Sequence, residues 1–411
     1  MRVGSGKCEL IFPEGFFPTE GFTCQAHPLF VRALVLGATK PVVLVSIEMT
    51  SLPDDEAGCL RGTAAASAAT RPENVWITVT HTFSAPHLLP DVLLDSTGLA
   101  RKKQLRAMLD DAVHTAVLQA KRATDDVEVL FSQRESSLPA SRDIELEDGW
   151  WIGCNGDGPA NRALTVLQFG RTRPRAILIH MNMQPSVLDG TGTKDGKCVS
   201  GDIAGLVSAY FERRYPAAVC LFMIGAAGDQ APVRKARGLC RNDDGSVEDV
   251  DLGAGGVALA ERLSVQLMSE ARDMLLEPGE VIGDEIGLVH GSVTVPMKKM
   301  NRDLHSLRPT RSCEWEPDGE AEQTFSILQL GRLAICGVKP ELTFETDAAI
   351  KTASPFCHTL VATLVNGSAK YMAARGVYDR CMYEAINSPF MPCAAEALAE
   401  AIIGELKGAF L

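Results

Sequence analysis

The amino-acid sequence predicts an α/β protein built from mixed β-sheets that are flanked by helices. Segments with the alternation of strands and segments with the periodicity of helices follow one another along the whole chain. This pattern is typical of α/β architectures rather than of sandwiches or bundles. Hydrophobic residues make up 46% of the 411 residues and charged residues 22%, as in a folded protein with a sizeable core. Because no repeat, low-complexity tract or linker interrupts the chain, we expect residues 1–411 to form one domain.

The N-terminal elements follow from apolar runs and from the charges between them. Residues 28–37 and 41–49 predict two strands on either side of the turn residues "ATKP". Acidic residues at 54–56 then begin an alanine-rich helix that ends near Ala69, since negative charge is favourable at a helix N-terminus. The segment "VWITVTHTF", residues 75–83, predicts the next strand.

The middle of the chain continues the alternation. Residues 100–122 predict a second helix with one apolar face, because Leu105, Leu109 and Ala112 recur at helical spacing. His114 on this helix is expected to pack or to lie at the surface rather than to bind a ligand. Further elements are predicted as strands at 127–133, 164–170 and 175–183, a helix at 201–214, and a buried strand from residue 217 that breaks into a glycine-containing turn.

The last part of the chain gives two further expectations. The polar segment 234–253, with "RNDDGSVEDVD", predicts a surface loop. Leu398, Ile402 and Leu406 stand four residues apart near the end of the chain and predict an amphipathic helix there.

Charge and hydropathy exclude some classes of partner. The net charge of −12 disfavours nucleic acid and anionic membranes, which need clustered Lys and Arg that this sequence lacks. No window approaches the ~18 apolar residues of a transmembrane helix, and the first residues lack the features of a secretion signal. We therefore expect a cytoplasmic protein with a small-molecule substrate, and the sequence leaves its oligomeric state open, a homo-oligomer included.

The twelve cysteines stand singly, without any CxxC pair. We expect most of them to be reduced and structural. Cys220 and Cys336 lie inside apolar runs typical of strands, where a thiol behaves as a small hydrophobe.

Residues capable of chemistry follow several of the predicted strands. Loops at strand ends carry function disproportionately, because a rigid sheet positions them. These residues are His81 and His87 in "VTHTFSAPH", His180, Asn182 and Gln184 in "HMNMQPS", Asp229 in "GAAGDQAP", Glu341 in "GVKPELTFE", and Tyr371 and Tyr383 in the segment after residue 365. A zinc hydrolase needs about three ligands from His, Asp or Glu and one open position. His81 and Glu341 are of the required types, but the same types also serve in structural hydrogen-bond networks.

Eight segments, taken in order, resemble the neutral/alkaline ceramidase family and its bacterial relatives. They are "FVRALVLG", "VLVSIEMTSLPDD", "RPENVWITVTHTFSAP", "VSGDIAG", "GAAGDQAP", "KPELTFE", "SPFCHTLVATLVNG" and "YEAINSPFMPCAAEAL". The resemblance runs from about residue 8 to the end of the sequence. It implies the α/β catalytic domain of zinc-dependent amidohydrolases, the true members of which split the N-acyl bond of ceramide. The immunoglobulin-like domain that follows in those members has no counterpart in this sequence.

The resemblance also implies a set of metal ligands. The family's HTHSGP motif matches "HTFSAP" and makes His81 the counterpart of the first zinc-binding histidine. The segment that carries the second zinc histidine matches "HMNMQPSVL", in which Gln184 takes its position. The ligand glutamate matches Glu341 in "KPE", and the ligand tyrosine matches Tyr371 in "NGSAKY".

Three more positions are carried over as candidate catalytic residues. Tyr383 matches a tyrosine that lies near the reacting carbonyl in the family, and Arg142 in "SRDIELEDG" matches a polar contact to substrate. Both could stabilise an oxyanion by hydrogen bonding. Asp229 would either orient another site residue or cap the following helix. Ala231 stands where true ceramidases have a serine.

Two departures from the family pattern concern the metal and the substrate. Gln184 is a neutral and weaker zinc donor than an imidazole, so affinity would fall, or a harder divalent ion would replace Zn²⁺. Phe83 replaces the second histidine of the HTHSGP motif and adds apolar volume to the site. His180 lies four residues before Gln184, ~13 Å along a strand, and cannot replace it. His87 is nearer, but an exposed loop position is favoured for it.

We therefore expect a cytoplasmic, metal-dependent hydrolase of the ceramidase-like type that cleaves an amide or related acyl bond in a small soluble substrate other than ceramide. Two alternatives stay open. One is a lactonase, lyase or isomerase for a polar metabolite on the same scaffold. The other is a binding protein that has lost catalysis.

Overall fold

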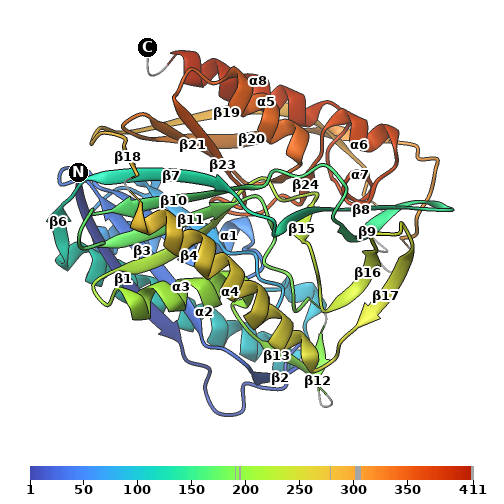
Figure 1. Cartoon of the computed structure of the whole chain (residues 1–411), viewed down its shortest axis with the longest axis horizontal. Helices are drawn as coiled ribbons and strands as arrows, with labels where there is room; N and C mark the ends of the chain where they lie inside the picture. The colour runs from blue at the N-terminus through green and yellow to red at the C-terminus, as the bar shows by residue number, and fades with distance from the viewer. Residues whose placement is uncertain (190, 194–195, 278, 301–306, 409–411) are drawn as a thin grey trace.

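Two five-stranded sheets lie face to face in the centre of the computed structural model and carry helices on their outer faces (Figure 1). The structure describes residues 1–411 except 190, 194–195, 278, 301–306 and 409–411. The first sheet has the order β5-β4-β3-β1-β6, with β1 Arg2–Leu10, β3 Leu29–Leu36, β4 Val42–Ile47, β5 Val75–Val79 and β6 Thr124–Asp126. The second has the order β14-β11-β10-β7-β18, with β7 Val129–Glu135, β10 Ala163–Phe169, β11 Ala176–Met181, β14 Val219–Ile224 and β18 Glu280–Val281.

Alternation along the strands divides the core into layers. On β3, Val31, Ala33 and Val35 face the helices α1 (Asp54–Ala68) and α2 (Ser96–Arg122), while Leu34 and Leu36 face the second sheet. The opposite face of the second sheet packs against α3 (Asp202–Arg214) and α4 (Gly255–Leu276). Side chains of a strand alternate between its two faces. Strands that are apolar at nearly every position are therefore buried on both sides.

Both sheets are mixed. The pairs β4–β5 and β11–β14 are parallel, and the other strand pairs of these two sheets are antiparallel. The predicted α/β class with mixed, helix-flanked sheets is confirmed. The predicted strands at 28–37, 41–49, 127–133, 164–170 and 175–183 correspond to β3, β4, β7, β10 and β11, and the predicted helices correspond to α1, α2, α3 and the terminal α8 (Ala394–Gly408).

A third sheet covers one side of this core. It has the order β19-β20-β21-β23, with β19 Ile286–Lys298, β20 Pro317–Leu330, β21 Leu333–Val338 and β23 His358–Ala362. Its apolar face packs against α5 (Phe344–Ala353) and α8, whose residues Leu398, Ile402 and Leu406 are buried there. In Figure 1 these helices form the upper edge of the molecule.

Smaller elements complete the region beyond the sheet ends. A five-stranded ribbon has the order β15-β8-β9-β16-β17, with β8 Pro139–Leu146, β9 Gly149–Asn155, β15 Gln230–Pro232, β16 Arg237–Arg241 and β17 Val247–Asp251. A short pairing joins β22 (Glu341–Leu342) to β24 (Tyr371–Met372). A small three-stranded sheet has the order β12-β13-β2, with β2 Phe22–Gln25, β12 Gly192–Thr193 and β13 Gly196–Val199. Two short helices, α6 (Arg375–Asp379) and α7 (Tyr383–Ile386), follow β24, and the single-turn helices η1 (Pro72–Asn74) and η2 (Asp91–Leu93) precede β5 and α2.

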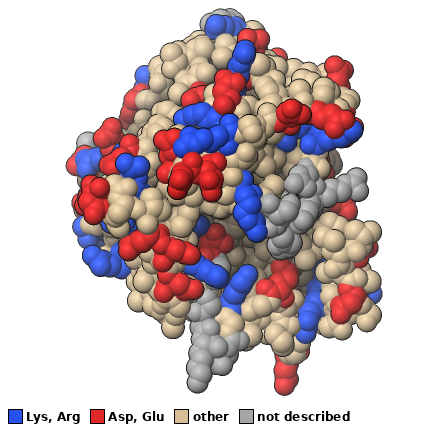
Figure 2. All heavy atoms as spheres, turned by 90° about the vertical axis from the view of Figure 1, so that its right-hand side faces the viewer, with Lys and Arg blue, Asp and Glu red and all other residues tan. Residues whose placement is uncertain are grey.

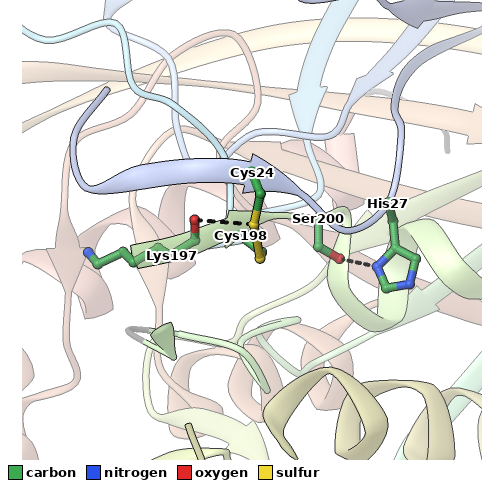
Figure 3. Close-up of a disulfide and its surroundings, with 5 residues drawn as sticks. All are labelled: Cys24, His27, Lys197, Cys198 and Ser200. Atoms are coloured by element: carbon green, nitrogen blue, oxygen red, sulfur yellow. Dashed lines mark hydrogen bonds between the residues drawn. A yellow bond between two sulfur atoms is a disulfide. The ribbon is translucent and has the colours of Figure 1, made fainter. Parts of the chain in front are cut away.

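Two expectations need correction. The predicted surface loop 234–253 contains the β16–β17 hairpin, whose alternating charged residues are exposed. The predicted strand 75–83 ends at Val79, because His81 has φ of 67°, which extended backbone does not adopt. Cys24 and Cys198 form a disulfide between β2 and β13 (Figure 3).

The other cysteines fit the expectation. Ten of them are free, and Cys220 and Cys336 are buried in β14 and β21 as predicted. Within the described residues, no helix has the length and apolar character needed to cross a membrane.

Candidate functional site

The candidate residues gather beyond the carboxyl ends of the strands. His81 lies two residues after β5, Gln184 three residues after β11, and Glu341 three residues after β21. Tyr371 begins β24, which pairs with β22 so that Glu341 and Tyr371 stand opposite each other in a parallel register. Ligand sites of α/β proteins are commonly found at this edge of a sheet, and strands from distant parts of the sequence bring these four residues together here.

A continuous chain of hydrogen bonds links five buried side chains. The Nε2 of His81 lies 3.1 Å from Oε2 of Glu341, and the amide Nε2 of Gln184 donates to the same oxygen at 2.9 Å. The amide oxygen of Gln184 accepts from Nη1 of Arg142 at 3.2 Å. The Nε of Arg142 then donates to Oε1 of Glu384 at 2.7 Å. Donors and acceptors alternate along this chain, so each of its links is satisfied.

The surroundings of His81 define its protonation. Its Nδ1 donates to the backbone carbonyl of Thr50 at 2.5 Å, and its Nε2 faces the carboxylate of Glu341. Both neighbours accept hydrogen bonds only, so the ring satisfies them best with a proton on each nitrogen. Burial alone would lower the pKa of His81, but the Glu341 carboxylate outweighs this effect and raises the pKa. Burial would likewise raise the pKa of Glu341, and His81 holds it below its ordinary value.

Arg142 is the cation at the centre of the site. Its guanidinium lies 4.9 Å from the ring centre of Tyr371 and 5.6 Å from that of Tyr383, and its Nη2 lies 2.6 Å from Oε1 of Glu384. Burial would lower the pKa of Arg142, but Tyr371 and Glu384 keep it above its ordinary value. Burial also raises the pKa of Tyr371 well above the usual range of a phenol. Both tyrosines are therefore proton donors at neutral pH.

Acidic residues lie behind Arg142. Glu384 is fully buried, and burial together with Glu384 raises the pKa of the neighbouring Asp143 well above its ordinary value. Asp143 therefore holds a proton beside the ion pair of Arg142 and Glu384. The residues sequence reasoning missed here are Glu384 and Asp143. The clue available in the sequence is that each directly follows a candidate catalytic residue, Tyr383 or Arg142.

Asp229 caps a helix, although not the helix that follows it in the sequence. Its carboxylate oxygens accept from the backbone N–H of Phe344, the first residue of α5, at 2.9 and 3.1 Å. Its own backbone carbonyl accepts from the N–H of Arg142 at 3.0 Å. Burial raises the pKa of Asp229 to about 7. Asp229 thus fixes the backbone of β8 and the entrance to α5, and its side chain bonds Gln230 and Phe344.

A cavity of about 350 Å³ opens beside the hydrogen-bonded chain. Phe83, Arg142, Gln184, Tyr371 and Tyr383 line it, together with Asp189, Lys235 and Arg237 and a few apolar residues. The ring of Phe83 meets that of His81 edge-on with centres 4.7 Å apart, and Trp151 supports Tyr383 at 5.5 Å. Figure 2 views the molecule from the side of β16 and β17, where basic and acidic side chains are interspersed. The cationic lining is therefore a property of the cavity rather than of this whole face.

Three of the candidate histidine and amide side chains are directed elsewhere. His87 pairs with Glu20 at 2.6 Å near the surface. His180 is buried in β11, where its Nε2 donates to the carbonyl of Val361 at 2.7 Å and burial lowers its pKa to about 4. Asn182 donates to Asp347 at 3.0 Å. His114 bonds Ser67 between α1 and α2, as expected for a packed residue.

The donor set does not match the zinc ion that the resemblance in the sequence implies. His81, Gln184, Glu341 and Tyr371 do converge, but two of the donors are committed elsewhere. The Nε2 of His81 carries its proton towards Glu341, and the oxygen of Gln184 is taken by Arg142. Turning the Gln184 amide to free the oxygen would set its NH₂ against the guanidinium. No group of three or more His, Cys, Asp and Glu that could hold a metal ion occurs in the described part of the chain. The residues present do not fit a four-ligand zinc site.

Comparisons with known proteins show the fold. No model of a protein family matches the chain, and no curated protein matches it in sequence. Two solved structures are similar over 98% of this chain and 74% of theirs, each with a TM-score of 0.76: neutral ceramidase from Pseudomonas aeruginosa, at 15% identity, and a structure described as ceramidase complexed with C2, at 14%. The resemblance noted in the sequence is thus confirmed at the level of the fold.

Proposed function

We propose that the chain is a hydrolase that cleaves an acyl bond, in an amide, ester or lactone, of a small soluble substrate with an anionic group. The observation that carries this proposal is that Arg142 lies beside the rings of both Tyr371 and Tyr383, and that all three residues line one cavity. Positively charged and hydroxyl donors held at a fixed place are what a developing oxyanion needs. The likeness in fold to ceramidases supports acyl-bond cleavage as the reaction class.

In the proposed reaction the carbonyl oxygen of the substrate lies beside the Arg142 guanidinium and the Tyr383 hydroxyl. As water attacks, negative charge moves onto this oxygen, and both donors stabilise it more strongly than they stabilise the ground state. Their positions are already fixed, because Glu384 holds Arg142 and Trp151 packs on Tyr383.

Glu341 is the proposed base: it takes a proton from the attacking water and passes it to the departing amine or alkoxide as the acyl bond breaks. Its Oε2 is held by His81 and Gln184, which leaves Oε1 to accept the proton. Its side chain keeps 8% exposure, so water can reach it. A carboxylate with a lowered pKa is a weak base, and the reaction therefore depends on stabilisation of the oxyanion to a large extent.

The lining of the cavity supports a small anionic substrate rather than ceramide. Lys235, Arg237 and Arg142 face a volume of about 350 Å³, near the lower end of the roughly 300–1,000 Å³ of small-molecule sites. Asp189 binds Lys235 at 2.9 Å at the cavity wall. A substrate carboxylate would compete with Asp189 for this lysine.

The cytoplasmic location expected from the sequence stays a prediction. The Cys24–Cys198 disulfide instead favours an oxidising compartment.

The experiment is a screen of acyl compounds in matched pairs. N-acyl amino acids, hydroxy-acid esters and carboxylated lactones would be compared with their neutral amide or methyl-ester counterparts. We expect turnover of an anionic member, a loss of about 10²–10³ in kcat in Tyr383→Phe, and a raised KM in Lys235→Gln for that member only. Lys103→Gln, at an exposed position on α2, is the matched control.

Two results would contradict the proposal. Preference for the neutral member of each pair would refute the substrate class. Tight binding of carboxylates without turnover, in wild type and Tyr383→Phe alike, would instead support the alternative of a binding protein.

A further inference from the structure

We infer that the Arg142 guanidinium, held by Gln184 and Glu384, takes the place of a metal ion in this site, and that Gln184 is the residue that makes the site independent of metal. The inference concerns the charge balance of the resting protein. It does not depend on the substrate or on the reaction proposed above.

The first support is the charge already present in the site. Arg142 and Glu384 form an ion pair whose side chains are at most 7% exposed. A divalent ion bound to the oxygen of Gln184 would lie beside the Arg142 guanidinium, and two like charges this close in a low-dielectric interior repel each other strongly.

The second support is the orientation of Gln184. A carboxylate only accepts hydrogen bonds and a guanidinium only donates them, so the partners define which end of the amide faces which neighbour. The NH₂ group points to Glu341 at 2.9 Å and the oxygen to Arg142 at 3.2 Å. The single atom of Gln184 that could bind a metal is thus already bound to a permanent cation.

The third support is that Arg142 cannot leave easily. Glu384 is fully buried and contacts Arg142 through both Nε and Nη2, at 2.7 and 2.6 Å. The rings of Tyr371 and Tyr383, whose centres are 6.0 Å apart, both pack beside the guanidinium. Moving Arg142 to admit a metal would leave the buried side chain of Glu384 without its partner. The guanidinium is therefore a fixed part of the site.

The test is the zinc content of the full-length chain. Wild type would be incubated with excess ZnCl₂, freed of unbound metal by gel filtration and analysed by mass spectrometry. The ten free cysteines bind some zinc, so His81→Ala serves as the background. We expect wild type and His81→Ala to hold equal amounts of zinc, and neither ZnCl₂ nor EDTA to move the melting temperature of wild type.

Gln184→His tests the role of the glutamine. We expect it to hold about one equivalent of zinc above the Gln184→His/His81→Ala double variant, because it restores a third strong ligand. Gln184→Leu, which removes the amide oxygen without adding a ligand, should show no such gain. If a variant does not fold, as judged by circular dichroism, the zinc content and melting temperature of wild type with and without EDTA decide alone.

Two outcomes would overturn the inference. About one equivalent of zinc in wild type above the His81→Ala background, with a melting temperature that falls in EDTA, would show that Arg142 does not replace a metal. A folded Gln184→His that gains no zinc would show that Gln184 does not control metal binding. Neither measurement uses a substrate, so failure of the proposed hydrolase activity would leave the inference unaffected.

Discussion

Replacement of Arg142 by methionine should destabilise the protein strongly, because it leaves Glu384 without its counter-ion. Glu384 has no exposed surface, and the side chain of Arg142 is 7% exposed, so solvent screens this ion pair little. Removing one partner of a buried ion pair costs about 3–5 kcal/mol, since the other charge stays buried and unpaired. Methionine fills a similar volume, so the cost reports on charge more than on packing.

The assay is urea unfolding followed by circular dichroism, together with the thermal midpoint. For a chain of 411 residues the unfolding entropy is about 0.9 kcal/mol/K, so a loss of this size lowers the melting temperature by roughly 3–6 °C. Glu384→Gln should lose a similar amount, because Arg142 is then the unpaired charge. The double variant Arg142→Met/Glu384→Gln should lose clearly less than the sum of the two single losses.

The double-mutant cycle is also the result that can refute the reasoning. If the two single losses add in the double variant, within about 0.5 kcal/mol, then Arg142 and Glu384 are not coupled as the structure requires. Arg142→Lys is the matched control. It keeps the charge but cannot reproduce the two contacts of the guanidinium to Oε1, so an intermediate loss is expected.

Three further predictions concern other parts of the fold. Gly225→Ala should cost more than about 2 kcal/mol, because the added Cβ would lie 2.0 Å from Oδ1 of Asn182; urea unfolding at the wild-type level would contradict this. Burial raises the pKa of Asp202 from 3.8 to about 6, so its contribution to stability is greatest below pH 4 and is lost as pH rises to 6. Asp202→Asn should flatten that decline of about 3 kcal/mol, and an unchanged pH profile of the unfolding free energy would argue against it. Reduction of the Cys24–Cys198 disulfide should lower the unfolding free energy of wild type by about 2–4 kcal/mol. It should leave a Cys24→Ser/Cys198→Ser variant unaffected. Equal unfolding free energies of wild type with and without reductant would show that the disulfide does not form in solution.

The sequence predicts the layered core well because local pattern and burial agree there. The residues of β3 and β4 are apolar at nearly every position, as expected of strands covered on both faces, and α2 shows its buried face in Leu105, Leu109 and Ala112. The apolar pattern does not predict the β16–β17 hairpin, because its exposed strands carry charged residues. The apolar pattern does not predict the end of β5 either, because it contains no signal for the positive φ of His81.

The candidate site is predictable in its residue types and much less so in its partners. His81, Gln184, Glu341 and Tyr371 follow strands, and strands bring their ends to one edge of a sheet. Which atom faces which is decided by tertiary contacts between residues far apart in sequence. Arg142 and Glu384, for example, are separated by 242 positions. A carboxylate in that position has the same sequence pattern as a surface residue, although here it is fully buried.

One fold can carry different polar centres for a physical reason. The sheets position side chains at their carboxyl ends by backbone geometry, which many apolar sequences satisfy, and 15% identity is enough for a TM-score of 0.76 to the ceramidase structure. The centre of the site must balance charge and satisfy each hydrogen bond, so one change of donor type alters what it can bind. With glutamine at position 184, the oxygen that faces the site attracts a guanidinium, and Arg142 is close enough to supply it. Positioning therefore belongs to the fold, whereas the donors and acceptors that meet at the centre of the site depend on a few side chains.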